Sequence, residues 1–163
     1  MTTAVQIEPE TRRETPIDPG ARIAADGKFL RLGVDRFLVK GVTYGTFAPD
    51  AQGYQFPSAD RIADDFRRMA RLGINTVRTY TAPRRDLLDE AARSGLRVMV
   101  GLPWAEHVAF LDDRDLKRQI RRDLIAKVRE LGDHPSVLAL ALGNEIPPGV
   151  VRWHGRMRVE RRR

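Results

Sequence analysis

The chain has 163 residues, 42% of them hydrophobic and 31% charged, which suffices for one domain with a buried core. It contains no cysteine, and this excludes disulfide frameworks and thiolate zinc sites. No stretch approaches the roughly 18 apolar residues of a membrane span, and the N-terminal residues lack the apolar core of a signal peptide. We therefore expect a soluble, cytoplasmic protein with no membrane partner.

The net charge of +7 raises the question of a nucleic-acid partner. Six arginines lie within residues 152–163, and without this segment the net charge falls to about +2. The basic charge is thus terminal and not spread over a patterned face, and no nucleic-acid recognition motif accompanies it. Nucleic acid is therefore an unlikely partner from the sequence.

The first part of the chain divides into a leader and a hairpin. Residues 1–20 are polar and contain three prolines, which predicts a disordered leader, so the single domain spans residues 21–163. Two short apolar runs around Gly33 then predict a β-hairpin over residues 27–40.

Strands and helices alternate in the remaining chain. Short apolar runs predict strands near residues 38–44, 74–80, 96–102 and 137–143. Apolar residues at helical spacing predict helices between them, which begin at Ser58, Pro83 and about Asp112 and end at Gly73, Gly95 and Gly132. Such alternation implies right-handed crossovers and a parallel sheet.

The strand ends distinguish two parallel architectures. A nucleotide-binding open sheet carries a glycine-rich turn after its first strand, and residues 44–49 show none. Large polar or aromatic side chains instead follow every strand: Tyr44, then Arg78 and Tyr80, then Trp104, Glu106 and His107, then Asn144 and Glu145. This favours an α/β fold of the (β/α)8 TIM-barrel type, preceded by the hairpin and truncated to about the first four β/α units.

Three motifs resemble a known family. They are Phe-Leu-Val-Lys-Gly-Val at residues 37–42, Leu-Gly-Ile-Asn-Thr-Val-Arg at 72–78, and Leu-Gly-Asn-Glu at 142–145. Together they resemble the retaining clan A glycoside hydrolases, most closely the catalytic TIM barrel of glycoside hydrolase family 2, over residues 27–148. The Gly-Asn-Glu that ends a fourth strand and the Asn-x-x-Arg of the second strand carry most of this resemblance.

The resemblance implies a role for each matching residue. Glu145 would be the general acid/base, Asn144 would contact the sugar 2-hydroxyl, and Arg78 would support the nucleophile. The substrate would be a β-linked carbohydrate, with hydrolysis and transglycosylation both open, and no cofactor is expected.

Further residues are candidates for substrate binding. Tyr44, Tyr80 and Trp104 would stack on sugar rings or, equally, pack in the core or at its rim. His107 would bind hydroxyl groups or lie in an ordinary loop, and His134 would be a turn residue. The three histidines lack metal-ligand spacing, so no metal site is expected.

The family takes its nucleophile from the seventh strand, and only four strands are predicted here. We therefore expect the N-terminal half of a catalytic domain, whose activity by itself is open and whose partner would be a C-terminal half or a second copy. The alternatives are an inactive carbohydrate-binding remnant and, less favoured, a basic-tailed nucleic-acid binder.

Overall fold

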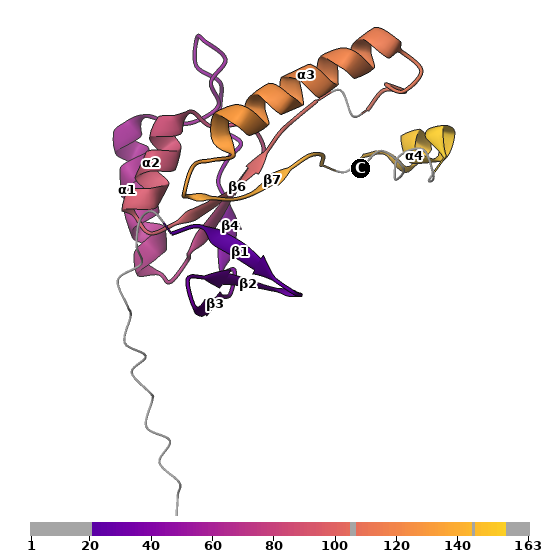
Figure 1. Cartoon of the computed structure of the whole chain (residues 1–163). Helices are drawn as coiled ribbons and strands as arrows, with labels where there is room; N and C mark the ends of the chain where they lie inside the picture. Colours follow the sequence, from indigo (N-terminus) through magenta and orange to yellow (C-terminus); the bar gives the residue numbers. More distant parts are fainter. Residues whose placement is uncertain (1–20, 105–106, 145, 156–163) are drawn as a thin grey trace, which may run out of the picture.

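A computed structural model describes residues 21–104, 107–144 and 146–155. The predicted leader, residues 1–20, and the arginine-rich segment 156–163 lie outside the described residues. Within the described ranges the chain forms an antiparallel sheet, then a parallel sheet whose strands are joined by helices (Figure 1).

The antiparallel sheet has three strands in the order β1-β2-β3. They are β1 (Ile23–Asp26), β2 (Phe29–Leu32) and β3 (Asp35–Phe37). The hairpin predicted over residues 27–40 corresponds to β2 and β3, and β1 is an additional strand that the sequence analysis missed. Its four residues include two alanines and carry little of the β-branched or aromatic signal of a strand.

The parallel sheet contains β4 (Gly41–Thr43), β5 (Thr76–Thr79), β6 (Arg97–Gly101) and β7 (Val137–Ala141), in that order. All three neighbouring pairs are parallel. The predicted α/β class with a parallel sheet is confirmed. Among the described residues the sheet does not close into a barrel, because β4 and β7 each have a neighbour on one side only.

In the described ranges, four helices accompany the parallel strands. They are α1 (Ala59–Arg71), α2 (Arg85–Arg93), α3 (Arg114–Leu131) and α4 (Pro148–His154). Helix α2 begins two residues after Pro83, the predicted start, which is within the usual uncertainty of helix ends. Within the described part of the chain, no helix is both long and apolar enough to cross a membrane.

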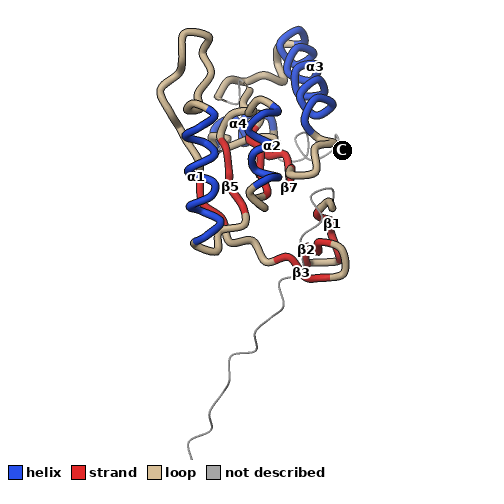
Figure 2. The backbone as a smooth tube through the Cα atoms, turned by 90° about the vertical axis from the view of Figure 1, so that its left-hand side faces the viewer, coloured by secondary structure: helices blue, strands red, loops and turns tan. Residues whose placement is uncertain are grey.

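The core lies between the sheet and its helices. Val77, Val98 and Val100 are fully buried on one face of the sheet, where Phe66 of α1 and Leu88 of α2 are buried as well. The helices α1 and α2 lie side by side on this face (Figure 2). On the opposite face Thr76 and Arg97 are buried, Arg78 and Met99 are half-buried and Ala139 is exposed. Among the described residues, this face is therefore open toward the C-terminal ends of the strands.

Helix α3 contacts the sheet mainly through its C-terminal half. Leu131 is fully buried and Leu124 packs against the core, whereas Val128, at helical spacing from both, is 40% exposed. Leu116 and Ile120, nearer the N-terminus, line a cavity. The N-terminal part of α3 extends away from the sheet, which explains why its apolar stripe is incompletely buried (Figure 1).

Asn75 fastens the first parallel strand to the second. Its Oδ1 accepts hydrogen bonds from the Lys40 N–H at 2.8 Å and the Thr76 hydroxyl at 3.0 Å, and its Nδ2 donates to the Leu38 carbonyl at 2.8 Å. The Asn75 N–H also donates to the Lys40 carbonyl at 2.9 Å. Because β4 is short and exposed, these bonds set its alignment against β5.

The antiparallel sheet is joined to the turn before β7. The Arg22 guanidinium, just ahead of β1, donates to the carbonyls of Gly132 at 2.5 Å and Asp133 at 3.4 Å. Both carbonyls lie at the N-terminal end of β7. The antiparallel sheet is therefore fixed at the end of the parallel sheet opposite to the predicted site.

His134 lies in that same turn, as expected, and is also a buried structural residue. Its Nδ1 accepts from the Ser136 N–H at 3.2 Å and lies 2.9 Å from the Ser136 hydroxyl. With Nδ1 acting as acceptor, the ring proton sits on Nε2, which is 3.0 Å from a carboxylate oxygen of Asp89. This chain of contacts ties α2 to the start of β7.

Candidate active site

The predicted Arg78 and Asn144 meet at the C-terminal edge of the parallel sheet. Arg78 lies near the end of β5, and Asn144 follows β7 by three residues. The guanidinium Nη2 donates to Asn144 Oδ1 at 2.6 Å, across 66 residues of sequence. The bond orients the Asn144 amide so that its oxygen faces Arg78. It also brings residues of two of the three sequence motifs, 72–78 and 142–145, into one site.

Tyr80 supports the position of Arg78. Its ring lies under the guanidinium, with 5.0 Å between Arg78 Cζ and the ring centroid, a cation–π arrangement. The ring is 38% exposed, so it offers a free aromatic surface beside the arginine. Arg78 is thus held from two directions, by an aromatic face and by an amide oxygen.

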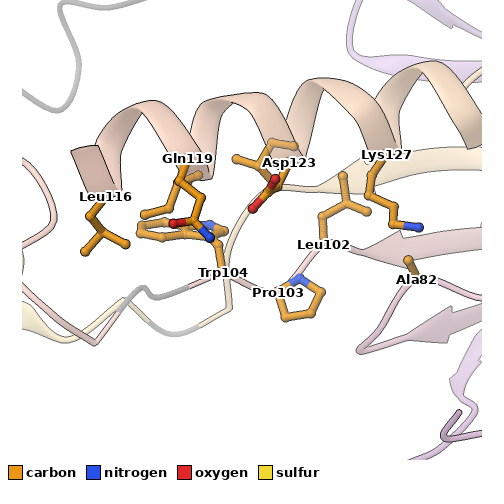
Figure 3. Close-up of a pocket in the computed structure, with 10 residues that line it drawn as sticks. Ala82, Leu102, Pro103, Trp104, Leu116, Gln119, Asp123 and Lys127 are labelled. Carbon is orange, nitrogen blue, oxygen red and sulfur yellow. The ribbon is translucent and has the colours of Figure 1, made fainter. Parts of the chain in front are cut away.

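Trp104 joins the loop after β6 to the end of β7. Its indole N–H donates to the Leu142 carbonyl at 3.2 Å, and its ring packs edge-on against Phe110 with centroids 4.7 Å apart. The indole lies beneath α3, next to Gln119 (Figure 3). The orientation of the Trp104 side chain is therefore fixed, and its hydrogen-bond partner Leu142 precedes Asn144 by two residues.

A cavity of about 310 Å³ lies between α3 and the loop after β6. Its walls are mainly apolar, with polar groups supplied by α3, and the lining consists of Ala82, Leu102, Pro103, Trp104, Leu116, Gln119, Ile120, Asp123, Leu124 and Lys127 (Figure 3). Trp104 is the single predicted site residue in this lining. The cavity is thus on the helix side of the sheet and apart from the Arg78–Asn144 pair.

Tyr44 is a core residue, the second of its two expected roles. It is 4% exposed and packs edge-on against Phe47 and Phe66, with ring centroids 5.0 and 5.1 Å away. Its hydroxyl donates to a carboxylate oxygen of Asp65 in α1 at 3.0 Å. Burial, with help from the Asp65 hydrogen bond and charge, raises the pKa of the Tyr44 phenol well above its usual range.

The raised pKa of Tyr44 predicts a loss of stability in alkali. Above pH ~10 the unfolded chain releases the Tyr44 proton while the folded chain retains it, so the free energy of unfolding falls as pH rises. Between pH 10 and 11 we expect wild type to lose about 1 kcal/mol more than Tyr44→Phe. Urea unfolding at pH 8 to 11 measures this, with Tyr80→Phe, which removes an exposed phenol, as the control. Parallel pH profiles for wild type and Tyr44→Phe would contradict the prediction.

The other predicted residues are less constrained. His107 is exposed in the loop after β6 and makes no hydrogen bond or ion pair with described residues. Glu145, the predicted acid/base, and Glu106 lie outside the described residues. In residues 21–104, 107–144 and 146–155 no cluster of three or more metal-ligating side chains occurs.

Helix α4 contacts the loop that follows β6, which the sequence analysis missed. One carboxylate oxygen of Asp112 accepts from the Trp153 indole N–H at 2.5 Å, and the other lies 3.8 Å from Nδ1 of His154. His154 is buried, and its ring lies 5.5 Å from that of Phe110, which in turn contacts Trp104. In the sequence, the adjacent tryptophan and histidine at the end of a helix are the feature that could have indicated this contact.

Comparisons with known proteins give matches in structure. No protein-family model matches the sequence, and no curated protein is similar to it. A β-glucuronidase from Parabacteroides merdae, solved with glycerol in its active site, matches with a TM-score of 0.61 and 24% identity over 77% of this chain and 16% of that chain. A Ruminococcus gnavus β-glucuronidase matches with a TM-score of 0.62 and 20% identity, over 78% of this chain and 22% of that chain.

A β-glycosidase from Bacteroides vulgatus matches with a TM-score of 0.62 and 17% identity, over 81% of this chain and 18% of that chain. The chain thus spans less than a quarter of the length of each of these three proteins. The TM-scores show a likeness of fold, and at these identities the likeness is one of fold alone. It agrees with the resemblance to glycoside hydrolases that the motifs predicted. The described residues share their α/β fold and its parallel sheet with part of each of these three proteins.

Proposed function

We propose that this chain is part of the catalytic domain of a retaining glycoside hydrolase or transglycosylase that acts on β-linked sugars. The observation that carries the proposal is the hydrogen bond from Arg78 to Asn144, which joins the ends of β5 and β7 at the edge where barrel enzymes bind substrates. The sugar binds beside this pair.

Each side chain then has a chemical role. Asn144 hydrogen-bonds a sugar hydroxyl, and Arg78 orients and keeps ionised the nucleophilic carboxylate. Tyr80 and Trp104 contact the C–H faces of the sugar, and His107 binds a hydroxyl at the rim. Glu145, one residue after Asn144, protonates the leaving group and then activates the acceptor, water or another sugar.

A retaining mechanism needs a second carboxyl group about 5–5.5 Å from the first. We assign this nucleophile to strands beyond β4–β7, because an eight-stranded barrel places active-site groups on several strands. A C-terminal half or a second copy of the chain supplies those strands by pairing with the free edges of β4 and β7. For a second copy, sedimentation analysis gives a dimer, and a stable monomer would exclude this arrangement.

Sugar binding tests the site directly. We expect methyl β-glucoside or methyl β-glucuronide to bind the chain, with affinity about tenfold lower in Arg78→Ala. The variant releases the Asn144 amide that hydrogen-bonds the sugar, and a hydrogen bond to a charged group contributes ~1.5–3 kcal/mol. Titration calorimetry or NMR shifts measure the affinity. Arg71→Ala, at the exposed end of α1, removes the same charge elsewhere and should bind like wild type. Failure of wild type to bind any methyl β-glycoside contradicts the proposal.

Turnover separates an enzyme from a binding remnant. The chain alone should not hydrolyse aryl β-glycosides, whereas fusion to strands that complete the barrel should restore activity. In that fusion, Glu145→Gln should retain sugar affinity and lower kcat by about 10²–10⁴, the usual contribution of general acid–base catalysis. Sugar binding without turnover in the completed barrel would assign the chain to carbohydrate binding instead.

A further inference from the structure

We infer that Trp153 is a second carbohydrate platform, which contacts a sugar ring beyond the one held at Arg78 and Asn144. This inference rests on the proposed function and extends it: the preferred ligand is a β-linked oligosaccharide and not a single sugar. Three observations carry it, namely the exposure of Trp153, its fixed orientation, and its connection to Trp104.

Trp153 combines exposure with order. Its side chain is 73% exposed, although burying an indole normally stabilises a fold by more than most side chains do. The indole N–H is nevertheless held by Asp112 at 2.5 Å, so the ring has a fixed plane. An exposed aromatic ring whose orientation is already set loses little conformational entropy on binding, and this suits it to stack on a flat ligand face.

Asp112 is the positioning residue for this platform. Its two carboxylate oxygens face Trp153 Nε1 and His154 Nδ1, so one loop side chain holds both aromatic residues at the end of α4. His154 is buried, and its Nε2 has no hydrogen-bond partner among the described residues, so the ring contributes packing against Phe110. The buried histidine anchors the helix end, and the neighbouring tryptophan faces solvent.

The platform is continuous with the proposed site. Ring contacts lead from Trp104 to Phe110 at 4.7 Å and from Phe110 to His154 at 5.5 Å. Helix α4 lies beyond the C-terminal end of β7, the end that also carries Asn144 (Figure 1). Consecutive rings of one oligosaccharide therefore have two aromatic surfaces available, Trp104, whose indole N–H donates to Leu142 two residues before Asn144, and Trp153.

The chemistry of the exposed ring suits a sugar. The C–H face of a sugar ring matches the electron-rich face of the indole. The Asp112 carboxylate already contacts Trp153 and His154, so it is not left over to pair with a cationic ligand.

The chain has two tryptophans, so fluorescence reports on Trp153 without its removal. In Trp104→Phe, the remaining emission comes from Trp153 and should begin at the long wavelength of a solvated indole. We expect β-1,3- or β-1,4-linked glucotetraose to shift it to shorter wavelength, and methyl β-glucoside to leave it unchanged. An unchanged spectrum with a tetraose that calorimetry shows to be bound would overturn the inference.

Affinity measurements provide the second test. Trp153→Ala should lower tetraose affinity about tenfold, equivalent to ~1.4 kcal/mol, and leave methyl β-glucoside affinity unchanged. Trp153→Phe should retain most of the affinity, and Asp112→Ala should lose part of it. Leu72→Ala, at an 80% exposed apolar residue after α1, is the matched control. Equal tetraose affinity in wild type and Trp153→Ala overturns the inference alone, whereas absence of all sugar binding in wild type overturns the proposed function too.

Discussion

Gly101→Ala is expected to destabilise the fold strongly and to abolish sugar binding. A Cβ at this last residue of β6 would lie 2.6 Å from the carbonyl oxygens of Thr79 and Tyr80, and backbone cannot move aside as a flexible side chain does. The strands β5 and β6 would have to separate at the edge that carries Arg78. We expect the free energy of unfolding to fall by about 3 kcal/mol, the upper range for overpacking.

Gly149→Ala is the matched control for this change. Gly149 lies in α4, and a Cβ there has nothing within 4 Å, so its stability should stay within about 0.5 kcal/mol of wild type. Urea unfolding followed by circular dichroism measures both variants, and calorimetry with a methyl β-glycoside measures binding. Equal stability of the two variants would contradict the close approach of β5 to β6 at Gly101.

Asn75→Ala is expected to detach β4 from β5. The change removes the acceptor for the Lys40 N–H and the Thr76 hydroxyl and the donor to the Leu38 carbonyl. Since Thr76 is 3% exposed, its hydroxyl would lose its partner in a dry environment. We expect a loss of about 2–3 kcal/mol, because unsatisfied buried groups cost their full desolvation.

Two variants sharpen this prediction. Asn75→Asp retains the acceptor oxygen and should lose less stability than Asn75→Ala. Asn144→Ala removes an exposed asparagine at the other end of the sheet, so it should weaken sugar binding with little effect on stability. Hydrogen exchange should show a faster-exchanging Lys40 amide in Asn75→Ala, and unchanged protection of that amide would contradict the role of Asn75.

The parallel sheet and the meeting of Arg78 with Asn144 were predictable from the sequence for one physical reason. Strands buried on both faces read as unbroken apolar runs, and parallel strands place their carboxyl ends at one edge. Polar residues that end different strands must then lie near each other, whatever their separation in sequence. The prediction required that neighbouring strands be parallel, and this follows from the alternation of strands and helices. The register, with its irregularity between Val98 and Met99, does not follow from that alternation.

Other features depended on the path of loops. Tyr44 follows β4, and Arg78 lies near the end of β5, yet only Tyr44 turns into the core. Its hydroxyl donates a hydrogen bond to Asp65 of α1. The pattern of the strands does not predict where that helix lies. The Asp112–Trp153 contact joins a loop to a helix 41 residues later and follows no periodicity. Val128 fits the apolar stripe of α3 but is exposed, because the helix extends beyond the sheet.

The order of the parallel strands has a consequence for how the protein is made. Each strand pairs with the one synthesised just before it, so β4 to β7 can assemble as they leave the ribosome without waiting for distant sequence. The contact of Arg22 with Gly132 is different, since 110 residues separate its partners. The segment around Arg22 thus reaches its final place only after the third helix has emerged.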